Sequence, residues 1–122
     1  MLHYKPIAKC GTTYTNPFGV ITTPIDYRGL YPNNICEHRI NVSDATHIVV
    51  EVLRFVSTHR SDWFAIYNGS TTDAFVLANF TDTDSQFQSY QTTNNVLIQY
   101  RSDRPNNEDG YKIVYHANYH GK

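Results

Sequence analysis

Apolar and polar residues alternate with a period of two through most of this chain, and that period restricts it to strands. The segment 36–42 (CEHRINV) shows the pattern most clearly. Its alternation predicts one side carrying Cys36, His38, Ile40 and Val42. Further strands are expected at 47–56, 62–67, 75–80, 85–91, 95–101 and 111–118. No stretch shows the 3.6-residue period of a helix.

Turn-forming clusters separate these segments, among them NGSTTD, TDTDS, TTNN and RPNNEDG. Short strands with one apolar face, spaced about ten residues apart, predict an all-β fold of two antiparallel sheets packed as a sandwich. A closed barrel is the alternative that the pattern leaves open. The residues expected to be buried in the core are Ile48, Val50, Phe64, Ile66, Ile98 and Ile113.

Size and charge narrow the possible functions. At 122 residues the chain fits a single domain, 1–122, with a core spanning 10–117. A formal charge of −1 and the lack of any long basic run argue against nucleic-acid binding. No apolar segment is long enough for a membrane span, and MLHYKPIAK does not resemble a secretory signal.

The two cysteines, Cys10 and Cys36, enclose a segment of about 27 residues that is rich in Pro, Gly and Asn. We predict that they form a disulfide, which would stabilise the fold by about 3.5 kcal/mol in the chain-entropy model. Such a bond persists only in an oxidising compartment. The alternative is a pair of unrelated buried thiols in a cytosolic protein.

Three Asn-x-Ser/Thr motifs agree with an extracellular location. The predicted glycosylation sites are Asn41, Asn68 and Asn79. Since the chain is rich in Asn, Ser and Thr, about two such motifs are expected by chance. The motifs are therefore consistent with secretion but are weak evidence for it.

A series of phrases between Cys10 and Tyr115 resembles the CUB domain family. The phrases are Cys10-Gly11, GVITTP at 19–24, YPNN at 31–34, VLIQYRSD at 96–103 and GYKIVYHA at 110–117. The resemblance implies a jelly-roll-like β-sandwich with an extracellular location, secreted or in a membrane protein's ectodomain. It also implies a non-catalytic module that binds another protein or receptor. Spermadhesins are among the proteins that carry this domain, and the resemblance to them implies binding of glycans or glycosaminoglycans as the alternative function.

The chain departs from the family pattern at two places. The family's second disulfide is absent, because only two cysteines are present. Many members bind Ca²⁺ through a Glu and two Asp with a supporting Tyr, and here Asp62, Asp103 and Tyr27 match all but the Glu. Since Ca²⁺ requires six to eight oxygens, we expect no resident cofactor and at most weak calcium binding. The alternative is that both Asp residues organise turns.

Strand 62–67 carries the aromatic residues that we consider for binding. If Phe64 and Ile66 face the core, Trp63 and Tyr67 face outward, where such residues often form interfaces. A covering loop is the alternative explanation for them.

No nucleophile-elbow phrase or Gly-rich oxyanion loop is present, so we expect the chain not to be an enzyme.

Overall fold

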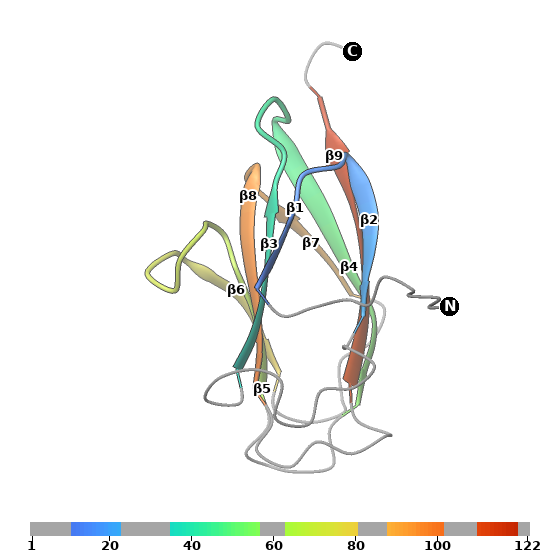
Figure 1. Ribbon diagram of the computed structural model, residues 1–122, viewed down its shortest axis with the longest axis vertical. Coiled ribbons are helices and arrows are strands. Elements are labelled where there is room, and N and C mark those ends of the chain that lie inside the picture. The colour runs from blue at the N-terminus through green and yellow to red at the C-terminus, as the bar shows by residue number, and fades with distance from the viewer. Residues whose placement is uncertain (1–10, 23–34, 57–62, 81–87, 102–109, 120–122) are drawn as a thin grey trace, which may run out of the picture.

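The computed structural model describes residues 11–22, 35–56, 63–80, 88–101 and 110–119. Nine strands form two facing sheets within these ranges, and Figure 1 shows the two layers side by side. This confirms the predicted all-β sandwich, and the closed-barrel alternative is wrong. None of the described residues forms a helix able to cross a membrane.

One layer is a five-stranded sheet. Its order is β1 (Thr12–Tyr14), β3 (Ile35–Asn41), β8 (Asn95–Arg101), β5 (Trp63–Tyr67) and β6 (Val76–Phe80). Strands β3, β8, β5 and β6 pair in antiparallel fashion, whereas β1 lies parallel to β3. The sheets are therefore mostly, but not wholly, antiparallel.

The other layer is a four-stranded sheet, and all its pairs are antiparallel. Its order is β2 (Phe18–Thr22), β9 (Gly110–Asn118), β4 (His47–Val56) and β7 (Gln88–Thr92). Strand β4 carries a register shift between Val52 and Arg54. In this order the outermost strands are β2 on one side and β7 on the other.

The strands expected from the sequence include none between the two cysteines, but β1 and β2 lie there. Strand β2 contains Gly19, a residue that usually weakens strands. A Cβ atom at Gly19 would lie 2.7 Å from Cε2 of Tyr115. Glycine is therefore needed because the Tyr115 ring packs directly on the backbone of β2.

The core fills the space between the sheets, as the alternation predicted. All six residues expected to be buried there have no exposed surface: Ile48, Val50, Phe64, Ile66, Ile98 and Ile113. Aromatic rings complete the core at one end, where the centroids of Tyr100 and Tyr111 lie 4.9 Å apart. Burial of each large side chain contributes roughly 1.5–3 kcal/mol relative to an exposed position.

Candidate interaction surface

Strand β5 presents alternate residues to the two sides of the five-stranded sheet. Phe64 and Ile66 are fully buried in the core, so Trp63 and Tyr67 face outward on the sheet's outer face. Both outward rings are half-buried rather than exposed, and Ala65 between them is 2% exposed. The outer face is thus partly covered by other parts of the chain.

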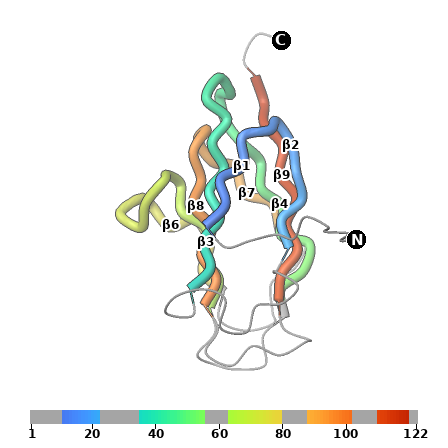
Figure 2. Tube along the Cα trace, in the orientation of Figure 1, coloured from blue at the N-terminus to red at the C-terminus, as the bar shows by residue number. Residues whose placement is uncertain are grey.

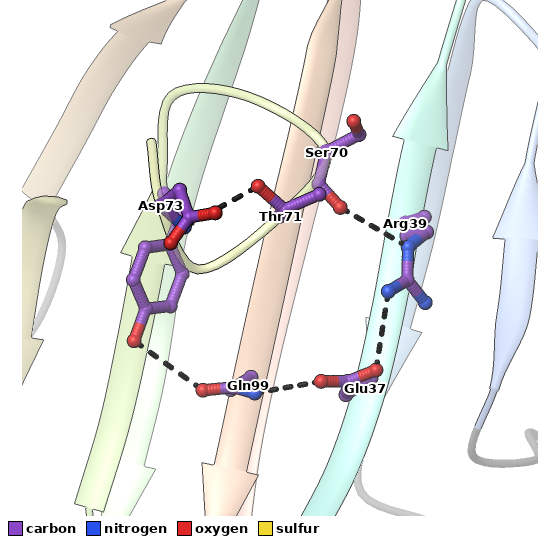
Figure 3. Close-up of polar contacts among 7 residues, drawn as sticks. Glu37, Arg39, Ser70, Thr71, Asp73 and Gln99 are labelled. Atoms are coloured by element: carbon purple, nitrogen blue, oxygen red, sulfur yellow. Dashed lines mark hydrogen bonds and ion pairs between the residues drawn. The ribbon is translucent and has the colours of Figure 1, made fainter. Parts of the chain in front are cut away.

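A chain of polar contacts crosses this outer face from β5 over β8 to β3 (Figure 3). The Tyr67 hydroxyl donates to Oε1 of Gln99 at 3.3 Å. Gln99 Nε2 in turn donates to Oε2 of Glu37 at 2.6 Å. The Glu37 carboxylate also pairs with the Arg39 guanidinium at 3.3 Å. These contacts hold four side chains of three strands in one arrangement.

The β5–β6 loop, residues 68–75, is hydrogen-bonded to Arg39, the last side chain of these polar contacts. Arg39 Nε donates to the backbone carbonyl of Ser70 at 3.3 Å (Figure 3). At the base of the loop, the amide of Asn68 donates to the carbonyl of Phe75 at 2.8 Å. Oδ1 of Asn68 accepts a hydrogen bond from the amide of Thr93 at 2.8 Å. The loop is therefore fixed to strand β3 and to the β7–β8 turn.

Hydrogen bonds inside the loop hold its tip. The amide of Ala74 donates to the carbonyl of Thr71 at 3.1 Å, and the amide of Asp73 donates to Oγ1 of Thr71 at 3.3 Å. Gly69 allows a close approach here, because a Cβ atom at that position would lie 2.6 Å from Cβ of Ala74. A side chain at position 69 would therefore push the two arms of the loop apart.

This ordered loop exposes apolar side chains. Phe75 is 74% exposed and Val76 is 42% exposed, although both residues are large and apolar. Figure 2 shows the loop, in yellow, standing out from the side of the sandwich. We define the β5–β6 surface as loop residues 68–75 together with Val76. Exposed aromatic residues held by a fixed backbone are typical of protein-binding surfaces.

A buried imidazole lies on the opposite, inner side of β3. His38 is fully buried, on the side of β3 that it was predicted to share with Cys36 and Ile40, and its Nε2 lies 2.6 Å from the Tyr111 hydroxyl. No residue in the described part of the chain forms a hydrogen bond with its Nδ1. Burial lowers the pKa of His38 to about 4. The side chain has no access to solvent and is therefore a core residue, not part of a surface site.

Several predicted site residues lie outside the described part of the chain. Asp62, Asp103 and Tyr27, the expected remnant of a calcium site, are among them, and so is Cys10. The described residues contain no group of three or more metal-ligating side chains. Calcium binding and the disulfide therefore remain predictions.

The other predicted cysteine, Cys36, is fully buried in β3. The amide of Gly11 donates to the carbonyl of Glu37 at 2.7 Å, and Thr12 lies opposite His38 in the parallel pairing of β1 with β3. The residues that follow the two cysteines in sequence are therefore hydrogen-bonded to each other. This proximity favours the predicted pairing of Cys10 with Cys36.

The three glycosylation motifs lie on strands of the five-stranded sheet or directly after them. Asn41, at the end of β3, and Asn79, in β6, are exposed. Asn68 is half-buried, and its amide oxygen is occupied by the hydrogen bond from Thr93. Glycosylation stays a prediction at all three positions, with Asn41 and Asn79 the more accessible.

Sequence patterns did not indicate that Phe75 and Arg39 belong to an interaction surface. Phe75 fits the apolar side of a strand, and its exposure depends on how the preceding loop folds. Arg39 alternates with the residues predicted to share the other side of 36–42, but its contact with Ser70, 31 residues away, has no local signal. The run of turn formers before Phe75 was the one available indication of an ordered, protruding loop.

Comparison with known proteins places this fold in a family. The CUB domain family model matches residues 10–115. Human cubilin is 29% identical over 114 residues, which is 89% of this chain and 3% of cubilin. Bone morphogenetic protein 1 of Xenopus laevis is 28% identical over 115 residues, and the match covers 88% of this chain and 16% of that protein.

A solved structure agrees with these matches. The MASP-1 CUB2 domain bound to Ca²⁺ has a TM-score of 0.63 and 21% identity, and the match covers 88% of this chain and 99% of that one. At this identity the likeness concerns the fold alone. CUB domains are generally extracellular modules that mediate interactions with other proteins and are typically non-catalytic. The family model covers most of the sequence and the sandwich agrees with it, so the chain belongs to the CUB domain family.

Proposed function

We propose that this chain is a non-catalytic extracellular module that binds another protein through the β5–β6 surface. The observation that carries the proposal is the 74% exposure of Phe75 at the base of a loop fixed by hydrogen bonds. Because hydrogen bonds already fix the backbone at Phe75, the chain loses little backbone freedom when a partner covers this side chain. Its burial then contributes to affinity with a small entropic cost.

A typical protein–protein interface is larger than this loop, so the proposed contact includes neighbouring surface. A specific protein–protein contact covers about 800 Å² on each partner, more than one loop provides. The adjacent outer face of the five-stranded sheet carries half-buried Trp63 and Tyr67. We therefore assign Phe75 and Val76 as the apolar centre of the contact and these two rings, with Arg39, as its margin.

Calcium has a limited role in this proposal. The Ca²⁺ in the MASP-1 CUB2 structure belongs to that protein. Here the family's Glu is missing, and the β5–β6 surface contains one carboxylate, that of Asp73. A single carboxylate provides few of the oxygens that Ca²⁺ requires, so binding at this surface should not depend on calcium.

The experiment is a binding screen against arrayed extracellular proteins, run in parallel with an array of glycans and glycosaminoglycans. We expect saturable binding to at least one protein, retained after a chelator removes calcium. Binding to glycans alone would contradict the proposal and favour the glycan-binding alternative, which the comparisons do not support. Loss of protein binding in the chelator would instead direct attention to Asp62 and Asp103.

A further inference from the structure

Strand β2 is an edge strand without the usual protection. It is the outermost strand of the four-stranded sheet, and its sequence, FGVIT, contains no charge and no proline. Phe18 is 71% exposed and Val20 is 57% exposed on its outer face. Natural edge strands usually carry Lys, Pro or a bulge that discourages pairing with another chain. Pro17 lies just before the strand, so it removes no backbone amide from β2, and the free edge of β2 can still pair with another chain.

The hydrogen bonds to β9 determine which backbone groups of β2 face the free edge. The amide of Ala117 donates to the carbonyl of Pro17 at 2.7 Å, so residues 17 and 117 form a hydrogen-bonded pair. In an antiparallel ladder such pairs alternate with non-bonded ones. Gly19 and Ile21 therefore point their backbone groups at β9, and Phe18, Val20 and Thr22 point theirs away. No other contact to these edge groups is found among the described residues.

We propose that β2 pairs in antiparallel fashion with β2 of a second copy of this chain, about a two-fold axis at Val20. In this register Phe18 of each copy faces Thr22 of the other, and the two Val20 residues face each other. Every edge N–H and C=O of these three residues then meets a complementary group. The result is one continuous sheet made from the four-stranded sheets of both copies.

The side chains beside β2 suit a second copy. Val20 lies opposite Val114 in β9, and Val114 lies opposite Glu51 in β4. The two-fold axis therefore creates an apolar row from Val114 to Val114 of the second copy, with a Glu51 at each end. In the neighbouring row, His116 of one copy and Lys112 of the other are three strand spacings apart, about 14 Å. That separation exceeds the screening length of physiological salt, about 8 Å, so these two basic side chains do not oppose the pairing.

We expect the assembly to stop at two copies. Strand β7 carries exposed, polar Gln88, Ser89 and Gln91. Pairing of β2 with itself uses the same surface on both copies and closes after one step. We therefore expect a dimer and not a filament.

The test is sedimentation equilibrium of the chain from 10 µM to 1 mM. A contact of one short strand is at the low end of specific interfaces, so a weak, reversible dimer is expected. Val20→Pro removes an amide that faces the free edge and spares the ladder to β9, and Gly19 before it tolerates proline. Both Val20→Pro and Val20→Lys should weaken dimerisation at least tenfold, whereas Gln91→Lys on β7 should leave it unchanged.

Hydrogen exchange locates the contact independently of the variants. The amides of Phe18, Val20 and Thr22 should become more protected as the concentration of the wild-type chain rises. A chain that stays monomeric at 1 mM overturns the proposal. A dimer that both Val20 variants leave intact, or that gives no added protection in β2, overturns it as well.

Discussion

At the scale of single residues, His38 shows how burial controls an ionisable group. Its ring lies between the two sheets, 6.0 Å from the Tyr14 ring and 5.7 Å from the Tyr111 ring, measured between centroids. Burial lowers its pKa to about 4, below the ordinary value near 6.5. The folded chain therefore keeps the imidazole neutral at pH values where the unfolded chain protonates it.

This difference predicts an acid-sensitive fold. The unfolded state binds the extra proton, so the free energy of unfolding should fall as the pH drops from 6.5 to 4, by at most about 3 kcal/mol. Denaturant unfolding at a series of pH values measures this slope. His38→Gln should flatten it, whereas His116→Gln, at an exposed position, should not. Equal slopes in wild type and His38→Gln would assign the acid sensitivity to other groups.

Arg39 acts on the β5–β6 loop more than on stability. Its ion pair with Glu37 is partly exposed and contributes less than about 1 kcal/mol. Arg39→Ala removes the donor to the Ser70 carbonyl, so amides in residues 69–75 should exchange hydrogen several-fold faster while the melting temperature changes little. Arg54→Ala, at an exposed position in the other sheet, is the control. Unchanged loop exchange in Arg39→Ala would show that the loop is held without this contact.

At the scale of strands, the sequence predicted the long elements better than the short ones. The bounds of β4 and β8 match the predictions, 47–56 and 95–101, because long β-branched runs lie between turn formers. Strands β1 and β2 were missed because they are short, Pro17 lies between them, and β2 itself contains Gly19. The parallel pairing of β1 with β3 is a long-range contact that no local pattern encodes.

Gly19 provides a test at this scale. Gly19→Ala would place a Cβ atom against the Tyr115 ring, whose hydroxyl donates to the Asn16 carbonyl at 2.9 Å and so restrains the ring. Such overpacking typically costs about 1–3 kcal/mol, so the melting temperature should fall by several degrees. Val20→Ala, which changes an outward side chain, should lower it less. If the two variants melt alike, the Tyr115 ring must be able to move aside.

At the scale of the whole molecule, the β1–β3 pairing brings the start of the described chain next to β3. We predict that Cys10 and Cys36 are disulfide-bonded in protein folded under oxidising conditions. Mass spectrometry without reduction should show their peptides linked. Cys10→Ser combined with Cys36→Ala should lower the free energy of unfolding by about 3.5 kcal/mol. Two thiols that alkylate freely in native protein would contradict the pairing and weaken the extracellular assignment.

The interaction surface was only partly predictable. Alternation in β5 correctly predicted that Trp63 and Tyr67 face outward, because successive strand residues point to opposite faces. The exposure of Phe75 was not predictable, because it depends on the Arg39–Ser70 and Asn68–Thr93 hydrogen bonds between distant segments. Sequence patterns thus indicate the face of a sheet, whereas loop geometry depends on the folded chain.

The most direct test of the proposed binding surface compares two exposed phenylalanines. Phe75→Ala lies in the β5–β6 surface, and Phe18→Ala lies on the other sheet with a similar exposure, 71% against 74%. The affinity of each variant for a protein partner is measured by surface plasmon resonance, at concentrations too low for self-association. We predict that Phe75→Ala weakens binding at least tenfold and that Phe18→Ala leaves it unchanged. Full affinity in Phe75→Ala would contradict the assignment of this surface.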